Sequence, residues 1–167
     1  MKILSLIIAL FFAGAISAQD CKYEIDELDA FTKVRITMSK PERLAATSKN
    51  EVYIKTSFKD NVYSIFIEPV TGEQFAINEG EDLLIMFADD SVVNLKATET
   101  VAVEKPVERT KTYREFVNYT VDPEIWEMLK SKPVKKIRIN ARGAKYDFDV
   151  LSAKGNLFGV LIKCVEK

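Results

Sequence analysis

The sequence predicts a β-rich α+β fold made of antiparallel hairpins, with a short internal helix near residues 123–131 and a C-terminal helix near 153–166. Three observations predict this class. Apolar residues recur at every second position along much of the chain, which is the period of a half-buried strand. Polar turn pairs such as Asp60-Asn61 separate successive segments of this kind. A helical spacing of apolar residues occurs in just the two segments named above.

The first 18 residues have the pattern of a secretory signal peptide. Lys2 precedes an apolar run from Ile3 to Ala13, and small residues follow up to Ala18. The run is shorter than the roughly 20 residues that span a bilayer, so a retained membrane anchor is the weaker alternative. We therefore expect residues 1–18 to be removed and residues 19–167 to form a single β-rich domain, with a possible subdomain division near 104–112. The expected location is periplasmic or extracellular, with no transmembrane segment after signal removal.

Two cysteines lie near the ends of the expected mature chain, at positions 21 and 164. Export to an oxidising compartment and the closeness of the two termini in many domains both favour a disulfide between Cys21 and Cys164. The alternative is a pair of free thiols, with Cys164 as a small apolar residue on a helix face.

Period-two segments define the strands of the first half of the mature chain. One is predicted at 34–38, and two more, at 52–58 and 62–67, form a hairpin around Asp60-Asn61. A two-residue loop there aligns the apolar faces by placing Phe58 opposite Tyr63, Thr56 opposite Ile65 and Ile54 opposite Ile67.

Further strands are predicted after residue 70. Phe75 and Ile77 begin one, and 83–87 pairs with 93–97 around Asp89-Asp90, with Phe87 opposite Val93 and Ile85 opposite Leu95. A short strand at 101–103 and a longer one at 113–121 flank the charged loop 104–112. A four-residue loop, 142–145, then places Ala141 opposite Tyr146, Ile139 opposite Phe148 and Ile137 opposite Val150.

Both helices have recognisable signals. Asp122-Pro123 is a capping residue followed by proline at the first helical position, and Pro133 limits the helix that follows. The C-terminal helix is indicated by apolar residues at helical spacing, although Gly155 and Gly159 each weaken it by about 1 kcal/mol relative to alanine. Those apolar residues are Leu157, Phe158, Leu161, Ile162 and Val165.

Composition excludes several kinds of chemistry. The 167 residues include no histidine, so histidine-dependent triads, histidine-ligated zinc and histidine pH switches are excluded. A net charge of −1 argues against electrostatic binding of nucleic acid. The sequence contains no recognisable nucleotide, nucleophile or redox motif. We therefore expect no cofactor.

Two charged patches are candidate surface sites. Glu79, Glu81 and Asp82 surround a glycine turn and could hold Ca²⁺, but they lack EF-hand spacing, and a solvated turn is the favoured interpretation. Lys136 and Arg138 share one strand face beside Arg142 and could meet an anionic lipid or polysaccharide. Facing aspartates would partly neutralise them, so a solvated sheet face is favoured there.

Several segments resemble small secreted proteins of unknown function from Bacteroidota. The resemblance lies in Tyr23–Lys33, Phe75–Leu95, Tyr119–Leu129 and the run from Val134 to Ile139. It implies a bacterial envelope or exported protein and carries no activity with it.

The sequence therefore predicts an exported, non-enzymatic binding or interaction module whose partner is an unidentified protein or envelope component. The alternative is a histidine-independent hydrolase that uses a carboxylate pair on a glycan. An uncapped sheet edge would favour the first function, and two acids with raised pKa values in a deep cleft would favour the second. The sequence leaves the oligomeric state open.

Overall fold

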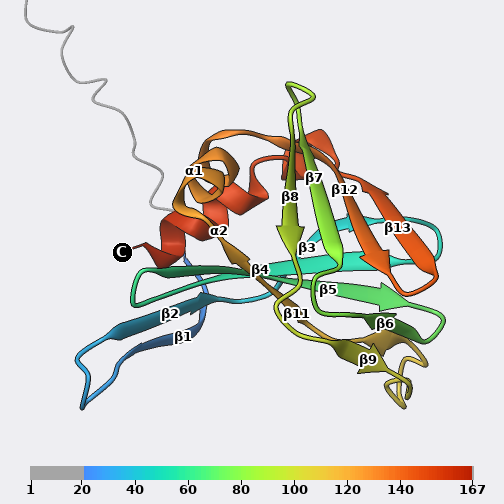
Figure 1. The fold of residues 1–167 in the computed structure, drawn as a ribbon, viewed down its shortest axis with the longest axis horizontal. Coiled ribbons are helices and arrows are strands. Elements are labelled where there is room, and N and C mark those ends of the chain that lie inside the picture. The colour runs from blue at the N-terminus through green and yellow to red at the C-terminus, as the bar shows by residue number, and fades with distance from the viewer. Residues whose placement is uncertain (1–20, 167) are drawn as a thin grey trace, which may run out of the picture.

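The computed structural model describes residues 21–166, so the predicted signal peptide lies outside the described residues. Within this range the chain forms antiparallel strands, one internal helix and one C-terminal helix, which confirms the predicted fold class (Figure 1). The strands are β1 (Tyr23–Leu28), β2 (Arg35–Ser39), β3 (Glu42–Ala46), β4 (Glu51–Lys59), β5 (Val62–Thr71), β6 (Phe75–Ile77), β7 (Asp82–Phe87), β8 (Val92–Lys96), β9 (Val101–Val103), β10 (Tyr113–Arg114), β11 (Val117–Val121), β12 (Val134–Ala141) and β13 (Ala144–Asp149). The helices are α1 (Pro123–Ser131) and α2 (Leu157–Val165), with a 3₁₀ turn, η1, at Ser152–Lys154.

Two large sheets enclose the hydrophobic core. The first has the order β1-β2-β4-β5-β10, with β3 also paired to β4 and β11 to β5; the second has the order β13-β12-β7-β8. A backbone bridge between Ala97 and Tyr119 links the second sheet to β11. Fully buried side chains from both sheets, such as Ile54, Ile67 and Ile137, meet between them. The helices lie together beside this core (Figure 1).

The hairpin of β4 and β5 has the predicted register. Phe58 pairs with Tyr63, and Thr56 pairs with Ile65. Asp60 and Asn61 have φ angles of 50° and 61°, so both turn residues lie in the left-handed region that a tight two-residue hairpin turn of this type requires. The polar turn pair therefore sets this register.

Two other predicted registers are wrong by two residues. Ile85 pairs with Val93 rather than Leu95, and Ile137 pairs with Phe148 rather than Val150. Between β12 and β13, Gly143 has a φ of 75°, and the loop closes in two residues rather than four. Because a shift of two keeps every side chain on the same face, apolar alternation does not distinguish the two registers.

The remaining differences concern segment boundaries. The strand predicted at 113–121 is two strands, β10 and β11, separated by Glu115 and Phe116. The C-terminal helix is shorter than predicted, because its first residues form η1 and α2 begins at Leu157. Strands β1 and β3 were not predicted from alternation.

Gly159 allows the two helices to pack closely. A Cβ atom at this position would lie 2.4 Å from the backbone oxygen of Lys130 in α1. The cost of glycine to α2 is therefore offset by a backbone contact that no other residue permits.

No helix in residues 21–166 has both the length and the apolarity needed to cross a bilayer.

Candidate interaction site

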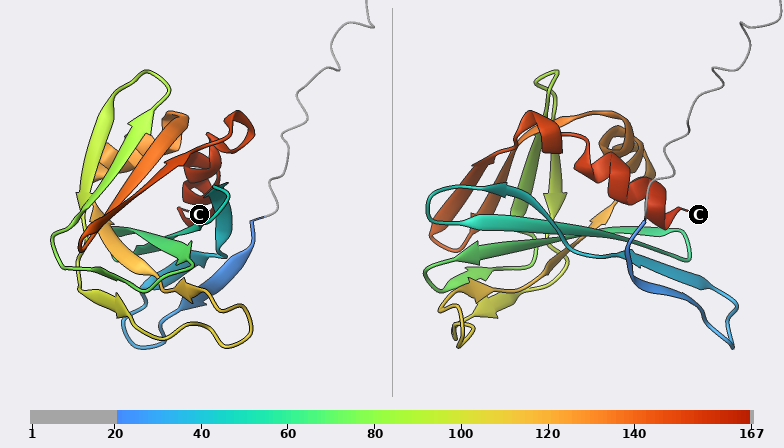
Figure 2. Two further views of the ribbon diagram at one scale, coloured as in Figure 1. Left: turned by 90° about the vertical axis from the view of Figure 1, so that its right-hand side faces the viewer. Right: turned by 180° about the vertical axis from the view of Figure 1, so that it is seen from behind.

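The hairpin formed by β1 and β2 projects from the body of the molecule (Figures 1 and 2). Its strands are paired from Tyr23 with Ser39 to Leu28 with Arg35, with a register shift near Ile25. β2 pairs on its other side with the end of β4, whereas β1 has no second strand partner among the described residues. The hairpin therefore joins the sheet through β2, and the outer backbone edge of β1 has no strand partner among the described residues.

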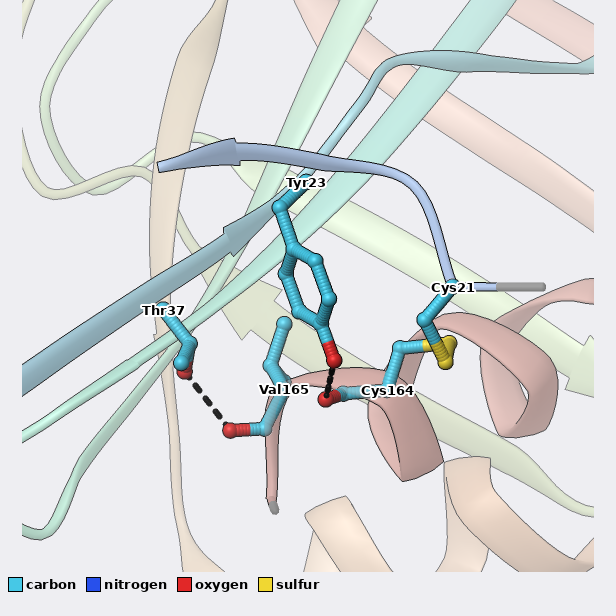
Figure 3. Close-up of a disulfide and its surroundings, with 5 residues drawn as sticks. All are labelled: Cys21, Tyr23, Thr37, Cys164 and Val165. Carbon is cyan, nitrogen blue, oxygen red and sulfur yellow. Dashed lines mark hydrogen bonds between the residues drawn. A yellow bond between two sulfur atoms is a disulfide. The ribbon is translucent and has the colours of Figure 1, made fainter. Parts of the chain in front are cut away.

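A disulfide joins the start of this hairpin to α2. Cys21 and Cys164 are bonded, with Cα atoms 5.5 Å apart, which confirms the predicted bridge. The Tyr23 hydroxyl donates a hydrogen bond of 2.9 Å to the carbonyl oxygen of Cys164 (Figure 3). These contacts define the hairpin base, which we take as Cys21, Tyr23 and Thr37 with their partners in α2.

Thr37 completes the hairpin base from β2. Its hydroxyl donates a buried hydrogen bond of 2.6 Å to the carbonyl oxygen of Val165 (Figure 3). The last carbonyls of a helix have no partner within the helix, so donors supplied by the hairpin satisfy the end of α2. Thr37 and Ser39 are consequently buried, whereas Ile36 and Met38 lie on the other face and are half-buried.

A buried lysine holds β1 from the outer face of the sheet. Lys55 is only 8% exposed, and its ammonium lies 4.3 Å from the centre of the Phe116 ring and 5.3 Å from that of Phe66. Glu24 of β1 closes this site with an ion pair of 3.0 Å to Lys55. A buried charge needs such partners, and aromatic faces and a carboxylate both attract an ammonium.

The opposite end of the hairpin, residues Leu28–Val34, is the hairpin tip. The Asp29 carboxylate accepts hydrogen bonds from the amides of Thr32 at 2.7 Å and Phe31 at 2.9 Å. These bonds hold the pKa of the Asp29 carboxyl below its usual value, because they favour its charged form. The Lys33 amide bonds the Asp29 carbonyl oxygen, so the turn is ordered by its own polar groups.

The ordered turn presents an aromatic side chain to solvent. Phe31 is 96% exposed and Leu28 is 62% exposed. Single exposed apolar residues are common on protein surfaces. Phe31 differs because it lies on a projecting hairpin whose turn is already fixed.

The predicted acidic patch does not converge on one point. Glu81 accepts hydrogen bonds from the amide and side chain of Asn78, and Asp82 pairs with Lys96. Glu79 is exposed beside them. Among residues 21–166 no group of three metal-binding side chains is placed to hold an ion.

The predicted basic patch is largely paired across its strands. Lys136 bonds Asp149 at 3.1 Å, and Arg138 bonds Asp147 at 2.6 Å. Arg142 lies exposed in the adjacent turn. The structure therefore leaves little unpaired positive charge on the strand itself.

Neither the resolved pKa shifts nor the hollow beside the disulfide indicates a pair of carboxylates suited to acid catalysis. Every aspartate with a resolved pKa shift has a lowered pKa, because each accepts hydrogen bonds in its charged form; these are Asp29, Asp82, Asp89 and Asp147. A hollow of 230 Å³ beside the disulfide has one carboxylate, Glu42. Its other lining residues are Lys22, Lys40, Leu157, Val160, Leu161 and Cys164.

The sequence predictions did not include the hairpin tip as a site. Its signal is an aspartate followed within three residues by an aromatic residue and threonine, Asp29-Ala30-Phe31-Thr32, which is typical of an ordered turn but says nothing of exposure. The resemblance to exported Bacteroidota proteins stays a prediction. No protein-family model, curated protein or solved structure matches this chain.

Proposed function

We propose that this protein is an exported binding module that engages a partner protein through the β1–β2 hairpin. The observation that carries the proposal is Phe31, an aromatic side chain 96% exposed at the tip of a projecting hairpin. Aromatic residues supply much of the binding energy at many protein interfaces, because they bury a large apolar area in a partner pocket.

The order of the hairpin supports this function. Binding is weakened when a loop must be immobilised at the moment of contact. Here the Asp29 carboxylate already fixes the turn, and the disulfide fixes the hairpin base to α2. Little conformational freedom would therefore be lost when Phe31 enters a pocket.

The disulfide is compatible with the expected export, because such bonds persist in oxidising compartments. Residence in the periplasm or outside the cell is part of the proposal. The structure offers no observation that favours the glycan-hydrolase alternative: the four aspartates with a resolved pKa shift all have a lowered pKa, and the hollow beside the disulfide has one carboxylate.

The proposal can be tested by placing a photo-crosslinking amino acid at position 31 of the exported full-length protein. The matched control carries it at position 151, because Leu151 is also a strongly exposed apolar residue, at 73%. We expect a discrete adduct from position 31 and none from position 151, and Phe31→Ser should abolish co-purification of the crosslinked protein. Equal labelling from both positions would contradict the proposal.

A further inference from the structure

The edge of β1 differs from the edges of the other strands that end the two large sheets, which are β10, β13 and β8. β10 is only two residues long, and β8 lies against β11. β13 is a terminal strand of the second sheet, but it lies against β3 of the first. β1 is a terminal strand of the first sheet, and its hairpin extends away from the body (Figure 2). Its outer row of backbone groups has no strand partner among the described residues.

An open strand edge can receive another strand, and many proteins prevent this with charged side chains (above all lysine), proline or a bulge. The charged residues of β1 are all acidic, so they repel acidic strands and not basic ones. β1 contains neither lysine nor proline. Its register shift lies at the hairpin base, between Tyr23 and Ile25, and the stretch from Ile25 to Leu28 is regularly paired. That stretch can form backbone hydrogen bonds with an added strand.

The charges of β1 disfavour a second copy of this chain as the added strand. A twofold antiparallel pair centred on Ile25 would place Glu24 opposite Asp26. Centring on Asp26 or on Glu27 would place that central acidic residue opposite its own copy. Like charges directly opposite each other destabilise a strand pair, so every central register is disfavoured.

The same charges favour a basic partner. Asp26 is paired with Arg35, and Glu24 is paired with Lys55. No ion pair within residues 21–166 involves Glu27, whose register partner on β2 is Ile36. Glu27 therefore offers an unpaired carboxylate on the same face as Ile25.

We propose that β1 receives an extended segment of the partner protein by strand addition, with a lysine or arginine opposite Glu27 and an apolar residue opposite Ile25. This inference rests on the proposed function and names the chemistry of the partner. The backbone edge supplies general affinity, and the carboxylate of Glu27 selects against acidic strands.

The test uses two synthetic seven-residue peptides that differ in one respect. In the first, one lysine and one valine lie two positions apart among threonine residues, so that they can face Glu27 and Ile25 together; in the second, glutamate replaces that lysine. Binding to the oxidised, signal-free protein is followed by fluorescence anisotropy, and amide NMR shifts locate the peptide. We expect the lysine peptide to bind at least about tenfold more tightly and to shift amides of β1 rather than β13.

Charge reversal provides the decisive variant. Glu27→Lys should weaken the lysine peptide about tenfold and strengthen the glutamate peptide, because it exchanges attraction for repulsion across the strand pair. Glu108→Lys changes net charge equally but lies in the loop after β9, on the far side of the molecule from the hairpin tip (Figure 1), and should change neither affinity.

Four results would overturn strand addition: no binding of either peptide, equal binding of both, amide shifts confined to β13, or a wild-type dimer with protected β1 amides. Crosslinking from position 31 with no peptide binding would leave the proposed function standing and remove this inference alone. Loss of both would remove the proposed function as well.

Discussion

The two ends of the β1–β2 hairpin differ in what holds them in place. At the hairpin base, a disulfide and two side-chain hydrogen bonds fasten both strands to the end of α2. At the hairpin tip, the hydrogen bonds are internal to the turn, and Phe31 contacts almost nothing. The difference suggests that the base serves stability and the tip serves recognition, because a rigid base lets an exposed side chain be held in one position.

The largest effect should come from the disulfide. Replacing both Cys21 and Cys164 with serine should lower the free energy of unfolding by about 2–5 kcal/mol, because the bond closes almost the whole described chain. Urea unfolding of the variant and of the oxidised wild type measures this difference. A change of less than about 1 kcal/mol would mean that the hairpin base is not a stabilising element.

Thr37→Val should have the next largest effect. Valine keeps the shape of threonine but leaves the buried carbonyl oxygen of Val165 without its donor, so we expect a loss of about 1–2 kcal/mol. Thr98→Val is the matched control, because Thr98 donates a comparable bond to a carbonyl oxygen at an exposed position. Equal losses in both variants would show that burial at the base is unimportant.

Tyr23→Phe removes one hydroxyl from the hairpin base. The bond to the carbonyl oxygen of Cys164 is partly buried, so we expect a loss of about 0.5–1.5 kcal/mol in urea unfolding. Relative to the wild type, amide hydrogen exchange should become faster in β1, whereas the exchange rates in β5 should stay unchanged. Unchanged exchange in β1 would indicate that the disulfide alone fixes this strand.

Phe31→Ser should change stability by less than about 0.5 kcal/mol, because the ring is almost fully exposed. Phe158→Ala is the contrasting variant, since Phe158 is fully buried in the core, and it should lose about 3–5 kcal/mol. Thermal unfolding of the two variants compares them directly. A large loss from Phe31→Ser would show that the tip is part of the fold.

The smallest effect is a local dependence on pH. Hydrogen bonds from Thr32 and Phe31 lower the pKa of Asp29 below its usual value of 3.8 in the folded protein. The stabilisation of the hairpin tip by the charged carboxylate is therefore complete above pH 3.8 and is lost as the pH falls through the lowered pKa. Amide NMR signals of Thr32 and Phe31 should report the change while core amides stay constant. Asp29→Asn should remove this pH dependence, since its side-chain oxygen accepts hydrogen bonds without titrating.

Some elements of the fold follow from local sequence, and others do not. The turn at Asp60-Asn61 was predictable because its residues favour the left-handed backbone that a tight hairpin needs. The start of α1 was predictable from Asp122-Pro123. The predicted registers of the β7–β8 and β12–β13 hairpins were wrong, because the alternation of apolar residues is unchanged by a shift of two residues.

The candidate site was less predictable than the fold. β1 alternates poorly, because most of its residues are exposed on a projecting hairpin and no core face selects them. The exposure of Phe31 depends on where the whole hairpin lies. The acidic and basic patches were visible in sequence, but their partners, such as Lys96 for Asp82, came from strand pairing.

Local periodicity, capping residues and residue counts were enough to predict the strand-rich class, the two helices and a pair of cysteines suited to a bridge. Which face of β2 is buried depends on the elements that pack against it in the folded chain. Alternation predicts two faces for the strand, yet the buried face is polar, with Thr37 and Ser39, because the end of α2 and the backbone of β4 require hydrogen-bonding partners there. The apolar face, with Ile36 and Met38, lies on the outer side of the hairpin that carries Phe31.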